Sequence, residues 1–164
     1  MEFFYLTIVV FLLVLAVFDL FVGVSNDAVN FLNSAIGAKV AKYKTIMIVA
    51  SLGVVIGAVM SAGMMDVARH GIMHPANYSF HEVMTIFLAV MVTDVIVLDM
   101  FNTLGLPTST TVSLVFELLG GTFILALLKM NADGSLEFED LLNSDKALSV
   151  IIAIFVSVAI AFFT

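Results

Sequence analysis

Long apolar segments alternate with short polar stretches along the whole chain. About 20 apolar residues are needed for a helix to cross the hydrocarbon core of a membrane. This pattern predicts an all-α integral membrane protein with about five transmembrane segments, organised as a single membrane domain over residues 1–164. The apolar segments are 3–22, 45–63, 82–103, 105–128 and 147–164. The polar connections between them include 64–81 and 129–146.

The first polar stretch, residues 23–37, follows directly on an apolar segment. It contains three Asn, one Asp, two Ser and two Gly within fifteen positions. Asn26, Asn30, Asn33 and Gly37 recur at the spacing of one helical face. We expect the helix to unwind at 23–25 and to restart at Asn26, which would present free backbone N–H groups to an anion inside the membrane. The plainer alternative is that these amides only join neighbouring helices, but their density favours a binding site.

The second polar stretch is 105–111. Gly105 and Pro107 end the preceding helix, and the four hydroxyl residues 108–111 stand at the start of the next. An ordinary helix cap uses one hydroxyl, so four in succession favour a ligand. Together, the two stretches predict two discontinuous helices of the kind found in secondary transporters, where helix N-termini face an anionic substrate.

Acidic residues within apolar segments are costly and mark candidate functional positions. Asp27, Asp94, Asp99 and Glu117 are such residues. Asp94 and Asp99 lie about 140° apart around a helix, so they face different sides. Carboxylates suit hard cations such as Na⁺, or can exchange H⁺.

Composition supports this assignment and excludes others. Hydrophobic residues make up 62% of the chain, mean hydropathy is +1.20, and there is no cysteine for a disulfide or a thiolate metal site. The net charge is −7 with six cations, which excludes nucleic-acid binding. The cluster Lys39, Lys42 and Lys44 predicts a cytoplasmic loop between the first two segments. His70, His74 and His81, with Asp66, have no standard metal spacing, so we expect 64–81 to be a solvated loop.

The residues of both polar stretches resemble a known family. The sequence from Gly23 to Asn30 is similar to the G-x-N-D-x-x-N-A signature of the inorganic phosphate transporter (PiT) family, and 105–111 is similar to its G-x-P-x-S-T-T-H stretch. The resemblance implies a phosphate symporter driven by Na⁺ or H⁺ and built from two inverted repeats. Carried onto this chain, it implies Asn26, Asp27 and Asn30 in the first motif and Ser109, Thr110 and Thr111 in the second as site residues.

Three departures from the family pattern stand out. Ser25 is inserted before the Asn-Asp pair, Val112 replaces the family's His, and each motif occurs once instead of twice. The chain is therefore expected to be the N-terminal half of an inverted-repeat transporter, or to pair with a second copy of itself.

These observations lead to one principal hypothesis: a multi-pass transporter, not an enzyme, in the plasma or inner membrane. It would carry inorganic phosphate across the lipid bilayer and need no cofactor besides the coupling ion. We expect the phosphate ligands to be Asn26, Asn30, Ser109, Thr110 and Thr111. We expect Asp27, with Asp94 or Asp99, to bind the coupling cation, Asp27 being the metal ligand.

Three alternatives remain. The substrate could be another oxyanion such as sulfate. The chain could be a cation or proton channel subunit that uses the intramembrane acids alone. It could also be a non-transporting subunit that only pairs with a partner.

Overall fold

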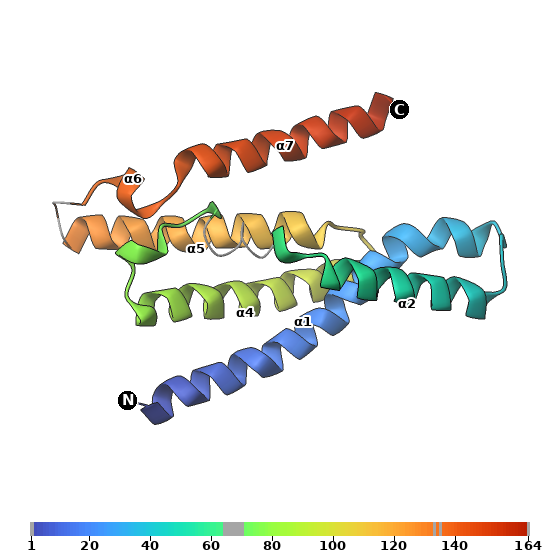
Figure 1. Cartoon of the computed structure of the whole chain (residues 1–164), viewed down its shortest axis with the longest axis horizontal. Coiled ribbons are helices and arrows are strands. Elements are labelled where there is room, and N and C mark those ends of the chain that lie inside the picture. Colours follow the sequence, from blue (N-terminus) through green and yellow to red (C-terminus); the bar gives the residue numbers. More distant parts are fainter. Residues whose placement is uncertain (1, 64–70, 133, 135, 164) are drawn as a thin grey trace. The chain divides into compact units, whose positions relative to one another are not determined.

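The computed structural model describes residues 2–63, 71–132, 134 and 136–163, and every long element in this part of the chain is a helix (Figure 1). Four helices are long and apolar enough to cross a membrane, and α2 is a shorter apolar helix. The predicted all-α membrane class is therefore confirmed. The long helices are α1 (Glu2–Gly37), α4 (Phe80–Leu104), α5 (Thr110–Ala132) and α7 (Ser144–Phe163), and the shorter elements are α2 (Tyr43–Val59), the 3₁₀ helix η2 (Pro75–Asn77) and α6 (Phe138–Leu141).

Helix α1 differs from the expectation, because it is continuous over 36 residues. The predicted interruption at 23–25 and restart at Asn26 are wrong. Ser25 does not cap a new helix: its Oγ donates to the Phe21 carbonyl one turn earlier, at 2.7 Å, as serines inside helices do. No free helix N-terminus therefore exists at Asn26, and any anion site must find its backbone donors elsewhere.

The chain divides into two compact units. The first comprises 1–65 with 91–113, and the second comprises 66–90 with 114–164. Helices α4 and α5 each contribute residues to both. The two predicted polar motifs fall entirely within the first unit, and the polar connections fall mainly within the second.

Helix α4 ends in a Schellman motif, in which two amides after the helix bond back to its last turn. The Gly105 amide donates to the Asn102 carbonyl at 3.1 Å, and the Leu106 amide donates to the Phe101 carbonyl at 2.9 Å. Gly105 has φ +69°, a conformation that glycine adopts at no steric cost. The predicted helix end at Gly105 is thus confirmed.

The chain then reverses direction between α4 and α5. Within the second unit, Glu82 near the start of α4 meets Lys129 near the end of α5, and Ile86 lies beside Gly121. Residues 105–109 are therefore a reversal between two antiparallel helices, not an interruption within one discontinuous helix as we expected.

Helix α1 ends in the same motif with a less suitable residue. The Lys39 amide donates to the Ile36 carbonyl at 3.2 Å, and the Val40 amide donates to the Ala35 carbonyl at 3.3 Å. Lys39 takes the left-handed position, with φ +51°. A side chain in this conformation is strained by about 1 kcal/mol or more.

The polar connection before α4 is partly buried, in contrast to the solvated loop expected over 64–81. Ile72 and Met73 are 1% and 2% exposed. They pair with the segment after α6: the Asn143 amide donates to the Ile72 carbonyl at 2.9 Å, and the His74 amide donates to the Leu141 carbonyl at 3.2 Å. Asp66 and His70 lie outside the described residues. The core of the second unit consists of Ile72, Met73, Tyr78, Ile86, Val90, Val115, Leu118, Ala126 and Leu141.

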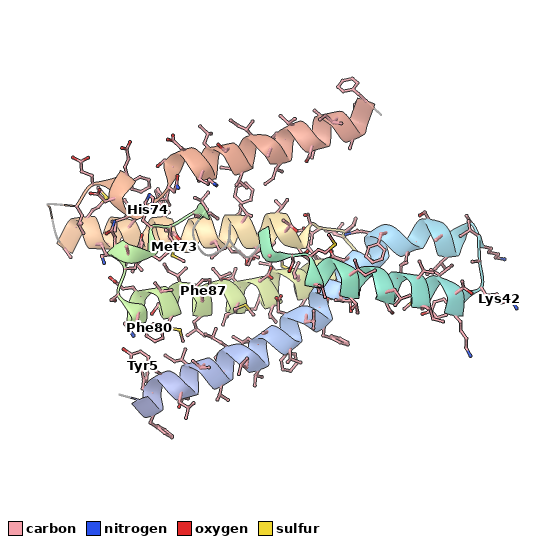
Figure 2. The ribbon with its side chains drawn as sticks, in the orientation of Figure 1. Tyr5, Lys42, Met73, His74, Phe80 and Phe87 are labelled. Atoms are coloured by element: carbon pink, nitrogen blue, oxygen red, sulfur yellow. The ribbon has the colours of Figure 1, made fainter. Side chains whose placement is uncertain are left out.

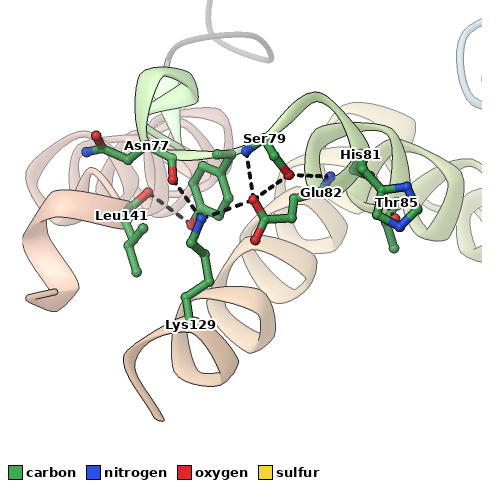
Figure 3. Close-up of polar contacts among 8 residues, drawn as sticks. Asn77, Ser79, His81, Glu82, Thr85, Lys129 and Leu141 are labelled. Carbon is green, nitrogen blue, oxygen red and sulfur yellow. Dashed lines mark hydrogen bonds and ion pairs between the residues drawn. The ribbon is translucent and has the colours of Figure 1, made fainter. Parts of the chain in front are cut away.

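A polar cluster joins the start of α4 to the end of α5 (Figure 3). The Lys129 ammonium lies 3.0 Å from Glu82 Oε2 and donates to the Asn77 carbonyl at 2.8 Å. It also lies 5.1 Å from the centre of the Tyr78 ring. Ser79 and Glu82 cap α4 reciprocally, with the Ser79 amide 2.7 Å from Glu82 Oε2. One lysine thus ties the beginning of one membrane helix to the end of the next.

The two Schellman motifs predict opposite effects of substitution. Gly105→Ala should destabilise the protein by about 1 kcal/mol, because alanine is strained at positive φ. Lys39→Gly should stabilise it by a similar or smaller amount, because glycine relieves that strain. Thermal unfolding of each variant in detergent measures both effects. Equal effects of the same sign would contradict this account.

Tyr78 gives a prediction about pH. Burial, followed by the nearby Glu82 carboxylate, raises the pKa of Tyr78 to about 12 from 10.0. The neutral phenol donates to the Leu141 carbonyl at 3.3 Å. Because the folded pKa is raised, this stabilisation is complete below pH 10 and is lost as the pH rises towards 12. The difference in phenolate absorbance between the wild type and Tyr78→Phe should therefore titrate near pH 12; a midpoint near 10 would contradict the burial.

Candidate functional site

A hydrogen-bonded pair of asparagines lies at the centre of the first unit. Asn26 projects from α1 and is 2% exposed. Its Nδ2 donates to Asn102 Oδ1 at 2.9 Å, and Asn102 Nδ2 donates to the Val22 carbonyl at 3.2 Å. Asn102 comes from the last turn of α4. The pair therefore fixes the end of α4 against the middle of α1.

Asn30, one turn further along α1, holds the loop between α4 and α5. Its Nδ2 donates to the Thr108 carbonyl at 2.9 Å and lies 3.4 Å from Asn26 Oδ1. The helical face predicted from the spacing of Asn26 and Asn30 is thus the face that meets the hydroxyl-rich stretch. Asn30 is exposed while Asn26 is buried, so Asn30 is the accessible member of this network.

Asp27 lies beside the first residue of α5. The Thr110 hydroxyl is 3.3 Å and 3.4 Å from the two carboxylate oxygens of Asp27. These are long contacts, and one hydroxyl donates to one oxygen at a time. The carboxylate is half-buried, so its oxygens retain acceptor capacity for a cation or a proton.

Gly23 allows these elements to approach one another closely. It is buried, and a Cβ built on it would lie 3.7 Å from Thr110 Cγ2 and 3.8 Å from Leu98 Cδ1. These are ordinary contact distances, so a methyl group fits. Any larger side chain would push α5 away from α1. Close packing accounts for a small residue at this position, and the predicted helix break does not.

The start of α5 provides the backbone donors of the site. Ser109 acts as an ordinary cap: its Oγ accepts from the Val112 amide at 3.4 Å. The first helical bond runs from the Ser113 amide to the Ser109 carbonyl at 3.0 Å. The amides of Thr110 and Thr111 precede this bond and lie at the positive end of the helix dipole. This end of α5 therefore attracts negative charge.

The intramembrane acids of α4 lie on different faces, as their spacing predicted. Asp94 is 4% exposed, whereas Asp99 is exposed. The described hydrogen bonds between α4 and α1 run through Asn102, which we had not assigned to the site. The sequence did offer one signal for Asn102: it is the last side-chain amide before Gly105, and it lies three residues after Asp99.

The oxygen that the structure places beside the Asp27 carboxylate is the Thr110 hydroxyl. Within the part of the chain that the structure describes, no group of three or more His, Cys, Asp or Glu side chains is arranged to hold a metal ion. A cation at Asp27 would thus take its further ligands from oxygens such as Thr110 Oγ1, a donor set that suits a hard cation.

Four apolar helices of spanning length, with a polar centre built from amides, a carboxylate and a helix N-terminus, are the features of a multi-pass membrane protein. The chain belongs to the Phosphate transporter family, whose family model matches residues 23–164 and thus includes both motifs. Comparison with curated proteins and with solved structures gave no significant match.

Asn102 gives a test of how the site is held together. Asn102→Leu keeps the side-chain size but leaves the side-chain amide of the buried Asn26 without its partner. The cost should be about 1–3 kcal/mol, because an unpaired buried polar group loses its solvation. Thermal unfolding in detergent measures the change, with the exposed neighbour Thr103→Val as the control. Equal stability of both variants would show that the amide pair does not hold the helices.

Proposed function

We propose that this protein transports inorganic phosphate together with Na⁺ or H⁺, and that the first unit carries one half of the transport site. The observation that carries the proposal is the meeting of the Asn26–Asn30 face of α1 with the N-terminus of α5. Membership of the Phosphate transporter family supports phosphate as the substrate.

The proposed phosphate ligands are neutral donors. Asn30, the Thr110 and Thr111 amides and the hydroxyls of 109–111 can bind oxyanion oxygens without a lysine or arginine. Asn26 contributes from its buried position by orienting Asn30. Neutral donors bind an anion more weakly than a bidentate arginine does, which suits a site that must also release its substrate. Asn30 would exchange the Thr108 carbonyl for phosphate on binding.

Asp27 is the proposed ligand of the coupling cation. The carboxylate lies next to the Thr110 hydroxyl, so a cation on Asp27 and an anion at the α5 N-terminus would lie close enough to attract each other. That attraction makes the binding of each favour the other. Asp94, buried on α4 of the same unit, is the second candidate, and Asp99 is less favoured because it is exposed.

The remaining half of the site must come from a second copy of the motifs. This chain has one copy of each, and transporters built from inverted repeats bind substrate between their repeats. A second repeat or an antiparallel homodimer would supply it. Uptake of labelled phosphate into proteoliposomes, with and without a Na⁺ or H⁺ gradient, tests the proposal; uptake displaced by sulfate better than by phosphate would favour the other oxyanion.

Asp27 and Thr110 provide the matched variants. Asp27→Asn should reduce gradient-driven uptake to about a tenth or less, because the variant loses one charged contact with the coupling cation. The protein should remain folded. Thr110→Val should reduce uptake because it removes the hydroxyl, and Thr110→Ser should retain it. Size-exclusion chromatography and circular dichroism check folding. Full coupled uptake by Asp27→Asn would refute the coupling role, and cation flux without phosphate would favour a channel.

A further inference from the structure

An apolar groove lies between α1 and α2, and its lining residues are not those of the candidate transport site. It has a volume of about 340 Å³ and is open to the surroundings. Its walls are almost wholly apolar. Phe31, Leu32 and Ala35 of α1 form one wall, and Ile46, Val49 and Ala50 of α2 form the other.

Three lysines stand at one end of this groove. Lys39, Lys42 and Lys44 are exposed and make up half of the six cations of the chain. Ala41, in the same loop, is itself part of the groove lining. Lys42 lies at the tip of the α1–α2 hairpin (Figure 2). The loop from Ala38 to Lys42 is short and joins the two helices that line the groove, so its charges stay near the end of the groove.

We propose that the lysine loop and the groove together bind one anionic phospholipid. The lipid phosphate pairs with the lysine ammonium groups, and an acyl chain lies in the groove. The arrangement matches an amphiphile, because a cluster of positive charges lies directly beside one end of an apolar groove. A free phosphate ion would use only the lysines, and a neutral lipid only the groove.

The side of the membrane on which we expect the lysine loop is the side where anionic lipids attract basic segments. The positive-inside rule places the lysine loop at the cytoplasmic leaflet, where anionic lipids attract basic segments beside membrane helices. The net charge of the chain is −7, so attraction to an anionic surface comes from this local cluster and not from the whole protein. The proposal uses none of the residues assigned to phosphate transport and is independent of that function.

Native mass spectrometry of the full chain in detergent tests the headgroup contact. Phosphatidylglycerol should bind as one molecule per chain and more tightly than phosphatidylcholine. The triple variant Lys39→Gln/Lys42→Gln/Lys44→Gln should weaken phosphatidylglycerol binding by about a hundred-fold, from the usual contribution of each lysine near an anionic surface. Lys146→Gln, a cation outside the groove, serves as the control and should leave it unchanged.

A second pair of variants tests the acyl chain. Ala50→Leu fills the groove and should reduce binding of phosphatidylglycerol at least ten-fold, whereas Ala58→Leu, on the exposed surface of the same helix, should not. Equal binding of both lipids, or an unaffected triple variant, would overturn the proposal. So would displacement of the lipid by inorganic phosphate, or a dimer whose formation excludes lipid, since these would assign the loop to a free anion or the groove to a second copy.

Discussion

The hydrogen bond between Asn26 and Asn102 is the contact on which the polar centre of the first unit depends. An amide buried at membrane depth is costly unless it is hydrogen-bonded. Here the Asn26 amide donates to the Asn102 side-chain oxygen. The pair holds the end of α4 against α1. Once α4 is held there, the loop that follows it reaches Asn30, and α5 begins with Thr110 beside Asp27. The positions of the hydroxyl-rich residues thus follow from one amide pair and from the short loop attached to it.

The continuity of α1 changes the electrostatics expected of this centre. A restarted helix would have brought a second positive dipole end to Asn26. The unbroken helix leaves the start of α5 as the source of backbone donors among the elements that meet here. That positive end lies next to the Asp27 carboxylate, so the centre offers opposite charges side by side. A site of this kind suits an anion and a cation that bind together better than it suits either alone.

Large apolar side chains are exposed along two of the long helices. The first half of α1 and most of α7 carry large exposed side chains such as Phe3, Phe18, Phe155 and Phe162. Such a surface is available to lipid or to a second repeat. The second unit, by contrast, is organised by its connections. Ile72 and Met73 pack into its core, and Lys129 ties α4 to α5 at a half-exposed ion pair that contributes about 1 kcal/mol or less. Its role is to fix where helices begin and end, more than to stabilise the whole.

The sequence by itself determined the class of protein, the end of α4 at Gly105 and the two motifs. Apolar length, the Gly105–Pro107 pair and the i, i+4 spacing of Asn26 and Asn30 are local signals, and local signals report on the chain's own backbone and faces. Only the tertiary structure decided that α1 passes Gly23 without a break, at a point where Thr110 and Leu98, which are distant in sequence, pack close to that glycine. The same holds for Asn102, whose partner lies 76 residues away, and for the buried Ile72–Met73 segment, whose polar neighbours suggested solvent. The structure at each of these positions depends on residues that are distant in the sequence, and a local sequence pattern carries no information about them.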